Sequence, residues 1–456
     1  MAEPLSSGPV STRLQRIAEL AKRAPGVAFT SLSHVIDIEF LEEAFRRTRK
    51  GGATGVDGQT AKGYERDLEE NLRSVLDRFK AGTYFAPPVR RAHVPKGEGT
   101  KMRPIGIPTF EDKVLQRAVA MVLNAVYEQD FRDCSHGFRP KRSAHQALQV
   151  LREGLMKMSG GWVYEVDIQS FFDTLDRGHL RSFLDQRVRD GVLRRMIDKW
   201  LKAGVLEEGS VSHPDLGTPQ GGVISPILAN IYLHEVLDVW FEAVVKPRMK
   251  GEAFLVRYAD DFVLVFALES DVRRVMDVLP KRFGKYGLTL HPEKTRLVSF
   301  RRPSLRAGPE GRERGSGAGT FDFLGFTHLW RRTRRGGWAI QQRTARGRLT
   351  RAIRRITEWC RGNRHRRVEE QHQVLEKKLK GHYEYYGLTW NSEMLSRFRY
   401  AVLGIWWKWL NRRSQRARMK WERYERLLGR FPLPLPIAVH SVCRPQRSRG
   451  PKSRMQ

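Results

Sequence analysis

The stretch Arg257-Tyr-Ala-Asp-Asp-Phe262 (RYADDF) places two neighbouring carboxylates between two apolar runs, AFLV (253–256) and FVLVF (262–266). The apolar residues on both sides predict two strands joined across Asp260 and Asp261. Adjacent negative charges repel, and the repulsion grows near a low-dielectric wall. Such a pair persists where a cation neutralises it or where the turn is simply hydrated. An Asp-Asp turn between strands is ordinary, so both interpretations stay open on this stretch alone.

A catalytic use of the pair requires a further carboxylate from another strand. Carboxylates at a strand turn can hold Mg²⁺, and two such ions can activate a 3′-hydroxyl and stabilise a leaving pyrophosphate. The segment GGWVYEVDIQSFFDTLD (160–176) begins as a strand that ends near Asp167, which makes Asp167 the best candidate. Asp173 and Asp176 are alternatives, although their positions after the strand suit a helix start or a solvated turn better.

Helical and extended patterns alternate along the chain. Residues 1–85 are predicted to be mainly helical, and 87–109 to form a hairpin with a basic rim. Strands are also expected in LTLHPEKTRLVSF (288–300) and FDFLGFTHLW (321–330). Further helices are expected over 110–128, 143–157, the later part of 216–245, 270–286 and much of the chain beyond 345.

The composition indicates a polyanionic partner. The 456 residues include 83 Lys and Arg against 50 Asp and Glu, a net charge of +33, which exceeds what solubility requires. Residues 1–300 hold 45 basic and 39 acidic side chains (net +6), whereas residues 301–456 hold 38 and 11 (net +27). Arginines on a helix most often form a solvated face. Eight of the eleven tryptophans lie in the same basic part, and that combination suits RNA binding. We therefore expect the polyanionic partner to be nucleic acid in preference to an anionic membrane.

The cysteines indicate a reducing compartment. Cys134, Cys360 and Cys443 are isolated, so they form neither a disulfide framework nor a zinc site. No stretch approaches the ~18 continuous apolar residues of a membrane span. We expect a cytoplasmic protein, in the bacterial cytoplasm or nucleoid, without membrane association.

Tyr258-Ala-Asp-Asp261 resembles the active-site motif of reverse transcriptases, and further blocks extend the resemblance over roughly residues 40–330. LKGHYEYYGLTWN (379–391) is similar to the thumb, or maturase, region of the same proteins. Several blocks of the sequence occur in the order found in group II intron reverse transcriptase/maturases. Besides VYEVDIQSFFDTLD, they are GVDG (55–58), KMRPIGIPTFEDKVLQRAV (101–119), SHGFRPKRSAHQAL (135–148), GTPQGGVISPILANIYLH (217–234), GLTLHPEKT (287–295) and FDFLGF (321–326).

The resemblance implies a right-hand polymerase, an α+β fold whose fingers and palm contain antiparallel sheet, followed by an all-α thumb. The N-terminal extension and the start of the fingers are expected in 1–85, and the fingers and palm in 86–335. The thumb, or maturase domain, is expected in 340–430, and a basic tail in 431–456. Many relatives carry a DNA endonuclease module with paired Cys and His after the thumb. No such cluster follows Arg430, so we expect the endonuclease-lacking subgroup.

The implied activity is RNA-directed DNA synthesis by two-metal-ion nucleotidyl transfer, with Mg²⁺ as the cofactor. The same family acts as maturases, which bind the intron RNA to assist its splicing and mobility (retrohoming). The implied partners are group II intron RNA, an RNA template with a DNA primer, deoxynucleoside triphosphates and a DNA target site. The sequence leaves a homodimer open.

Carried over position by position, Asp167, Asp260 and Asp261 resemble the palm carboxylates that hold the two Mg²⁺ ions. Phe172 falls where the family places the aromatic residue that excludes a ribose 2′-hydroxyl. Ordinary core packing is the alternative for Phe172, because Phe171 is adjacent.

The other implied nucleotide contacts are polar. Lys101 and Arg103 resemble fingers residues that hold the triphosphate, Gln220 resembles a residue that touches the incoming nucleotide, and Lys294 lies where polymerases often keep a general acid. The three cations could instead be solvated surface charges. Exposed RNA contacts are expected at six arginines of the basic part: Arg351, Arg354, Arg355, Arg364, Arg366 and Arg367.

Two other functions stay open. The first is an RNA-binding splicing factor without polymerase activity, which the intact Asp167, Asp260, Asp261 and Gln220 argue against. The second is a reverse transcriptase recruited to another role, such as phage defence or CRISPR spacer acquisition.

Overall fold

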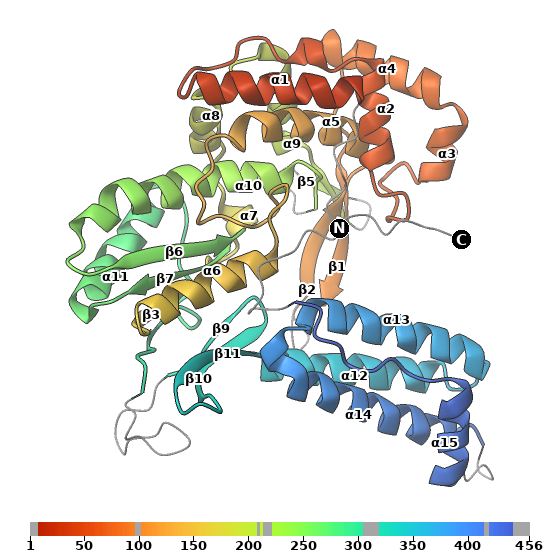
Figure 1. Cartoon of the computed structure of the whole chain (residues 1–456). Helices are drawn as coiled ribbons and strands as arrows, with labels where there is room; N and C mark the ends of the chain where they lie inside the picture. The colour runs from red at the N-terminus through yellow and green to blue at the C-terminus, as the bar shows by residue number, and fades with distance from the viewer. Residues whose placement is uncertain are drawn as a thin grey trace. The chain divides into compact units, whose positions relative to one another are not determined.

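The computed structural model of the chain describes residues 8–95, 102–207, 210–212, 221–303, 319–414 and 419–440 (Figure 1). The chain divides into two compact units, each with its own hydrophobic core. Unit 1 contains residues 1–151 and 162–297, and unit 2 contains residues 152–161 and 298–456. Within the described ranges, no helix combines the length and the apolar character needed to cross a membrane.

The N-terminal part of unit 1 is built around one mostly buried helix, α5 (Phe110–Tyr127). Thr109 caps this helix, because its hydroxyl accepts a hydrogen bond from the Asp112 backbone N–H (3.2 Å). α1 (Pro9–Arg23) and α2 (Ile38–Arg47) pack on α5. The other helices of this part are α3 (Ala61–Arg66), α4 (Leu68–Lys80), α8 (Arg177–Asp185) and α9 (Gly191–Lys202). The helical pattern predicted for 1–85 and 110–128 is confirmed for the described residues.

The hairpin predicted in 87–109 is also confirmed. β1 (Val89–Pro95) and β2 (Met102–Ile107) pair antiparallel, with Arg90 opposite Ile107. They extend into a four-stranded sheet of order β2-β1-β4-β5, in which β4 (Val205–Glu207) runs parallel to β1 and β5 (Ser210–Ser212) pairs with β4.

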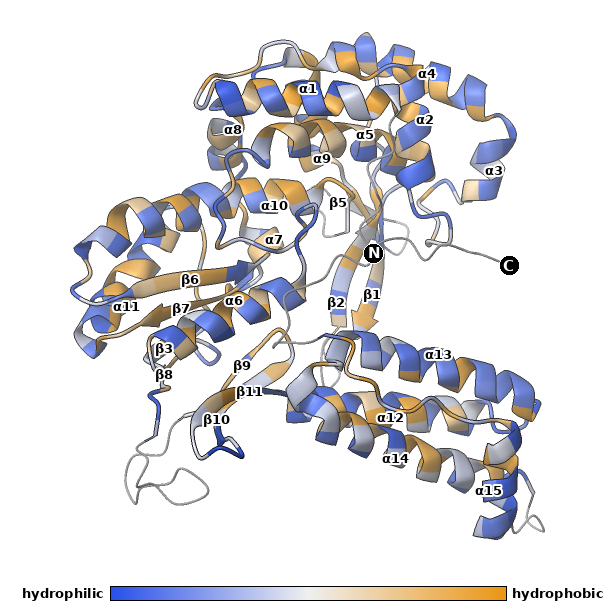
Figure 2. Ribbon diagram, in the orientation of Figure 1, coloured by the Kyte–Doolittle hydropathy of each residue, from blue (hydrophilic) through white to orange (hydrophobic). Residues whose placement is uncertain are grey.

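A second four-stranded sheet has the order β6-β7-β3-β8. β6 (Ala253–Tyr258) and β7 (Asp261–Phe266) form the predicted hairpin, and β3 (Trp162–Val166) pairs antiparallel with β7. The hairpin strands are mostly hydrophobic (Figure 2), and every residue of β7 after Asp261 is buried. α11 (Glu269–Gly284) packs on β3 and β7.

The strand expected over 288–300 is shorter in the structure. Only β8 (Arg296–Ser299) is a strand, Leu290 makes an isolated bridge to Ile168, and residues 292–294 form a turn. Pro292 explains the interruption, since proline has no backbone N–H to donate and fixes φ.

Two more helical segments complete the middle of the chain. α6 (Ala144–Lys157) was expected over 143–157, and a short helix α7 (Phe171–Thr174) follows β3. The described part of the apolar segment 216–245 forms α10 (Ser225–Leu233) and continues as π-helical turns over His234–Asp238 and Phe241–Val245. A 3₁₀ turn, Lys246–Arg248, follows.

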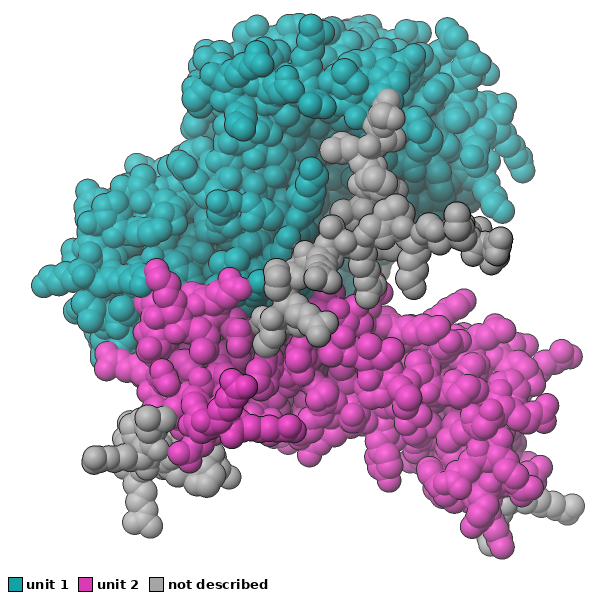
Figure 3. Space-filling model, in the orientation of Figure 1, with its two compact units in different colours: residues 1–151, 162–297 teal, residues 152–161, 298–456 magenta. Residues whose placement is uncertain are grey.

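Unit 2 (Figure 3) combines a three-stranded antiparallel sheet with a group of helices. The sheet order is β11-β10-β9, from β9 (Phe321–Phe323), β10 (Phe326–Arg332) and β11 (Trp338–Thr344). β11 was not predicted from the sequence. The helices are α12 (Arg346–Gly362), α13 (Val368–Tyr386), α14 (Ser392–Leu410) and α15 (Trp421–Arg430).

Polar contacts hold this small sheet to the helices of unit 2. The Thr344 backbone N–H donates to Oδ1 of Asn391 (2.9 Å), and Nδ2 of Asn391 donates to Oγ1 of Thr344 (2.7 Å). The Tyr385 hydroxyl donates to the Leu324 carbonyl (2.9 Å). Residues 319–335 therefore belong to the same compact unit as the helices, whereas the expected domain boundaries grouped them with the palm.

Candidate active site

Asp260 and Asp261 lie at the turn of the β6–β7 hairpin. Tyr258 pairs with Asp261, so Ala259 and Asp260 form a two-residue turn. Ala259 has φ +59°, the left-handed conformation that tight hairpin turns require. Asp260 is half-buried and Asp261 is exposed. The sequence thus predicted the strands and the position of the turn correctly.

Strand register brings Asp167 to the same place. Val166, the last residue of β3, is paired with Phe262 of β7. Because the strands are antiparallel, continuing this register by one residue puts Asp167 opposite Asp261. Opposed residues in such a ladder point to the same face of the sheet and lie about 4.5–5.5 Å apart at Cα.

The alternative carboxylates have local roles in helices. Asp176 caps α8, since its Oδ1 accepts a hydrogen bond from the His179 backbone N–H (2.7 Å). Asp173 lies exposed in the first turn of α7. These are the positions that the sequence favoured for them.

Lys294 forms an ion pair with Asp167, and its side chain is 53% exposed. The turn at Pro292 brings it there, because the backbone N–H of His291 donates to the Asp167 carbonyl (2.8 Å) just before the chain reverses. Lys294 therefore lies beside one of the three candidate carboxylates.

The donor set at this edge of the sheet suits Mg²⁺. This ion prefers oxygen ligands and commonly takes one or two carboxylates, completing its shell with water and substrate phosphates. Asp167 directly after β3, Asp261 at the start of β7 and Asp260 in the turn supply such oxygens. Over the residues with described positions, no group of three or more His, Cys, Asp or Glu is arranged to hold a metal ion. These three carboxylates therefore suit a Mg²⁺ ion that is also coordinated by substrate phosphates better than one that is coordinated by protein ligands alone.

The two adjacent phenylalanines occupy different environments. Phe171 is 3% exposed and contacts Tyr232, with ring centroids 6.3 Å apart. Phe172 is half-buried and meets Phe171 edge to face at 5.2 Å. Ser170, just before them, has φ +46°. The core role therefore belongs to Phe171, and Phe172 keeps a partly exposed ring near the end of β3.

Of the remaining nucleotide candidates, the structure describes Arg103, which lies exposed on β2 opposite Val94. Lys101 and Gln220 lie outside the described residues. Gly221, with φ +113°, approaches β2 closely, since a Cβ there would lie 2.5 Å from the Gly106 carbonyl oxygen. The segment that follows Gln220 thus packs against the strand that carries Arg103.

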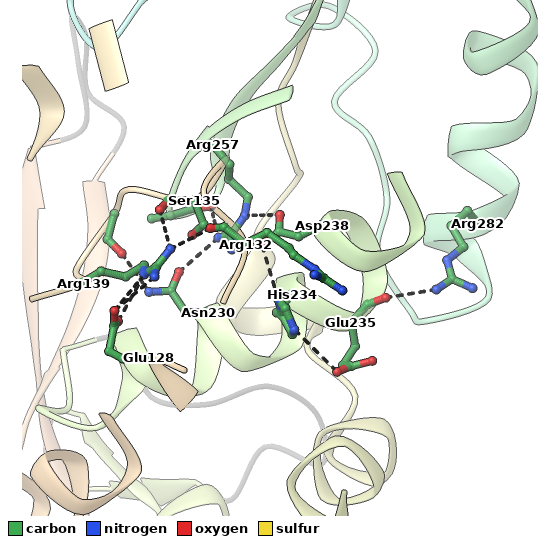
Figure 4. Close-up of polar contacts among 12 residues, drawn as sticks. Glu128, Arg132, Ser135, Arg139, Asn230, His234, Glu235, Asp238, Arg257 and Arg282 are labelled. Carbon is green, nitrogen blue, oxygen red and sulfur yellow. Dashed lines mark hydrogen bonds and ion pairs between the residues drawn. The ribbon is translucent and has the colours of Figure 1, made fainter. Parts of the chain in front are cut away.

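Sequence reasoning missed a buried arginine behind the turn. The Arg257 side chain is fully buried and donates to both carboxylate oxygens of Asp238 (2.8 and 2.5 Å) (Figure 4). It also donates to Oδ1 of Asn230 and to the Ala259 carbonyl, each at 3.0 Å. Burial by itself would lower the pKa of the guanidinium, but Asp238 raises it above its ordinary value. Arg257 therefore stays charged and holds the turn from behind.

A loop that contains Cys134, His136 and Gly137 also packs against this turn. The backbone N–H of Arg257 donates to the Cys134 carbonyl, and the Arg257 carbonyl accepts from the His136 backbone N–H, both at 2.8 Å. A Cβ on Gly137 would lie 2.2 Å from the Ala259 nitrogen, so only glycine fits there. An arginine inside an apolar strand and Asp238 inside an apolar helix were the signals that could have indicated a buried pair.

The six arginines of the basic part lie on α12 and on the loop between α12 and α13. Arg354, Arg355, Arg366 and Arg367 are exposed, as expected. For Arg351 and Arg364 the expectation of an exposed side chain was wrong. Both are half-buried, because their guanidinium groups fold back onto the carbonyls of Gly347 and Arg361 (3.0 Å each).

The chain is similar to a known protein family and to several characterised or named proteins. A family model described as reverse transcriptase (RNA-dependent DNA polymerase) matches residues 94–328, more than half of the chain. Group II intron-encoded protein LtrA of Lactococcus lactis subsp. cremoris is 39% identical over 284 residues, which cover 61% of this chain and 45% of the relative. Protein YkfC of Escherichia coli (strain K12) is 33% identical over 328 residues, 63% of this chain and 84% of YkfC.

A mitochondrial plant protein is a more distant relative. Nuclear intron maturase 3 of Arabidopsis thaliana is 26% identical over 233 residues, which cover 44% of this chain and 32% of the maturase. The chain thus spans less than half of the length of LtrA but most of YkfC. The matched range of the family model contains Asp167, Asp260 and Asp261.

Proposed function

Because this chain belongs to the reverse transcriptase (RNA-dependent DNA polymerase) family, we propose that it is an RNA-directed DNA polymerase that extends a DNA primer on an RNA template. The observation that supports the activity most directly is the β3–β7 register, in which Val166 pairs with Phe262. Its continuation by one residue would set Asp167 opposite Asp261, beside the turn residue Asp260. Three carboxylates at one sheet edge suit the binding of divalent cations.

In this proposal Asp167, Asp260 and Asp261 hold two Mg²⁺ ions. When bound, the ions supply the positive charge that activates the primer 3′-hydroxyl and stabilises the leaving pyrophosphate. Lys294, already beside Asp167, donates a proton from Nζ to the pyrophosphate. Phe172 excludes the ribose 2′-hydroxyl of the incoming nucleotide.

The triphosphate is held by side chains near β2. Arg103 and Lys101 supply cationic donors to the phosphate oxygens, and Gln220 contacts the nucleotide. The close approach of Gly221 to Gly106 supports a shared location for the Gln220 segment and the strand that carries Arg103.

We further propose a maturase role, in which the chain binds a group II intron RNA and assists its splicing and mobility at a DNA target. The names of two relatives, a group II intron-encoded protein and an intron maturase, support this role. The net charge of +27 in residues 301–456 supports RNA contact by the helices of unit 2, which we propose as the thumb.

Primer extension tests the polymerase proposal. Purified full chain with Mg²⁺, deoxynucleoside triphosphates and an RNA template bearing a DNA primer should make full-length DNA. Asp167→Asn, Asp260→Asn and Asp261→Asn should each abolish extension, because an amide binds Mg²⁺ poorly, while affinity for the template–primer stays within about twofold. Asp173→Asn is the matched control and should extend normally.

Two outcomes would contradict the proposal. Full activity in a variant of the carboxylate set removes that residue from the metal site. No extension by the parent chain, with tight RNA binding retained, favours the splicing factor without polymerase activity.

A further inference from the structure

Phe138 is an exposed aromatic residue in a strained backbone conformation beside the hairpin that carries Asp260. Its side chain is 58% exposed, and its φ is +56°. A bulky residue rarely adopts positive φ, and such strain often marks a functional position. The Phe138 ring centroid lies 6.1 Å from that of Tyr258, the residue that precedes the turn.

One buried anchor fixes the chain just before Phe138. The Gly137 carbonyl accepts a hydrogen bond from Nδ2 of Asn230 (2.7 Å). Gly137 also packs against the turn so closely that a Cβ would lie 2.2 Å from the Ala259 nitrogen. Asn230 bonds Arg257 as well, so the position of Phe138 is coupled to the residue that holds the turn.

A second anchor follows Phe138 directly. The Arg139 side chain is buried and donates to the carboxylate of Glu128, with Nη2 at 3.1 Å from Oε2 (Figure 4). Its Nη1 also donates to the carbonyls of Arg132 (2.7 Å) and Ser135 (2.8 Å). Strained backbone persists only where the surroundings over-determine it, and these bonds on both sides of Phe138 do so.

The fold gains little from the Phe138 ring, because most of its surface remains in water. The ring does offer a flat apolar face near the candidate carboxylates. Lys141, three residues on, is exposed and also has positive φ. An exposed aromatic face with a cation three residues further along the chain suits a nucleobase and its phosphate, since every base has a face on which an aromatic side chain can stack.

We propose that Phe138 stacks on a nucleobase of the bound template–primer next to the reacting end. The location of the site rests on the proposed function, but the contact itself requires only nucleic-acid binding. The base can come from the RNA template or from the DNA primer, and both have the same stacking chemistry.

Binding without nucleotides gives the first test. Fluorescence anisotropy of a labelled template–primer should show that Phe138→Ala weakens affinity by about 5- to 150-fold, the range of base–aromatic stacking. Phe138→Tyr keeps the ring and should stay within about twofold of the parent. Phe85→Ala is the matched control, since Phe85 is another exposed phenylalanine of unit 1 (75% exposed), and it should bind normally.

Three results of this measurement would overturn the contact. They are parental affinity in Phe138→Ala, an equal loss in Phe138→Tyr, and an equal loss in Phe85→Ala. The first would leave the ring available to a protein partner instead. Because no DNA synthesis is measured, a chain that fails to extend primers yet loses affinity on Phe138→Ala supports the stacking contact and contradicts only the polymerase proposal.

A fluorescent base shows whether Phe138 stacks on the RNA template or on the DNA primer. 2-Aminopurine is placed either in the template opposite the primer end or at the 3′ end of the primer. The parent chain should change the fluorescence of one probe, and Phe138→Ala should remove that change. If neither probe distinguishes the parent from Phe138→Ala, stacking at the reacting end is wrong.

Thermal unfolding separates this role from a structural one. Glycine adopts positive φ without strain, so Phe138→Gly should melt at or above the temperature of the parent while binding as weakly as Phe138→Ala. A melting temperature lowered by more than about 4 °C would show that the ring stabilises the fold, and the proposal would fail.

Discussion

At the scale of single residues, Arg257 acts on the candidate active site from behind. Its guanidinium joins Asp238 to the carbonyl of the turn residue Ala259. Removing one partner of a buried ion pair costs about 3–5 kcal/mol, so Arg257→Ala should be strongly destabilised. The more informative change keeps the charge.

Arg257→Lys should fold but synthesise DNA slowly. An ammonium cannot bond both oxygens of Asp238 and the Ala259 carbonyl at once, so the turn loses its fixed position. We expect kcat for primer extension to fall by about 10- to 100-fold, with template–primer affinity unchanged. Steady-state kinetics and equilibrium binding check this, and a loss of affinity with normal kcat would argue against a positioning role.

Phe172 and Phe171 should respond differently to truncation. If Phe172 excludes the 2′-hydroxyl, Phe172→Ala should raise incorporation of ribonucleotides relative to deoxyribonucleotides by roughly 10-fold or more. Phe171→Ala, a change in the core, should instead lower the free energy of unfolding by about 3–5 kcal/mol. Competition assays and thermal unfolding measure the two effects. If Phe172→Ala leaves the ratio of ribonucleotide to deoxyribonucleotide incorporation unchanged, Phe172 serves core packing and does not exclude the 2′-hydroxyl.

At the scale of elements, strand β10 carries a buried histidine with an unusual environment. His328 is fully buried, and its ring stacks on Phe321 at 4.5 Å. Among the described residues neither ring nitrogen has a hydrogen-bond partner. Burial lowers the pKa of His328 to about 3, so the folded chain holds it neutral, whereas the unfolded chain protonates it near pH 6.5.

This difference predicts a loss of stability in acid. Between pH 6.5 and pH 3 the unfolded state binds the extra proton, so the contribution of His328 is complete above pH 6.5 and falls as the pH drops. The loss is about 2 kcal/mol at pH 5. His328→Phe should remove that part of the pH dependence and stabilise the chain at pH 5. Denaturant unfolding at pH 7.5 and pH 5 tests it, with exposed His365→Gln as the control that should change nothing.

The elements differ in how far the sequence could predict them. The β6–β7 hairpin and α5 were predictable because their apolar patterns are continuous and their ends carry a turn or a cap. β11 was missed because Gln341 and Gln342 break its apolar pattern, although both are buried, with Nε2 of Gln341 donating to the Trp390 carbonyl (2.5 Å).

The site was predictable only where its signals were local. The Asp260 turn follows from neighbouring residues, whereas the alignment of Asp167 with Asp261 depends on strand register across 93 intervening residues, and the family resemblance supplied it. The Arg257–Asp238 pair and the strain at Phe138 depend on packing between distant segments. No periodicity in the chain indicates them.

At the scale of the whole molecule, cationic charge is concentrated in the last third of the chain, with +27 beyond residue 300 against +6 before it. Neutralised phosphates release counterions, so RNA affinity should fall steeply with salt. The proposed metal ligands belong to unit 1 and the proposed RNA contacts to unit 2, so we expect their roles to be separable.

Replacing the exposed arginines Arg355, Arg366 and Arg367 by glutamine tests this separation. RNA affinity should fall, and the log–log salt slope should decrease by about 0.7–0.9 for each lost phosphate contact. Protein-assisted splicing should slow as well. The control Arg273→Gln removes an exposed arginine on α11 of unit 1 and should have little effect. Normal splicing in the triple variant together with failed splicing in Asp261→Asn would contradict the division of roles.

The interleaved path of the chain constrains how the protein is made. Residues 152–161 leave the ribosome early, but the residues that they contact are translated much later. The Ser159 carbonyl accepts a hydrogen bond from the Arg302 backbone N–H (3.0 Å), and the Gly161 carbonyl accepts one from the Phe300 backbone N–H (2.7 Å). Ile340 is translated later still, and its carbonyl accepts a hydrogen bond from Nε of Arg152 (3.1 Å). Residues 152–161 must therefore remain without these partners while more than a hundred residues are translated, and no single cut in the gene separates the two units.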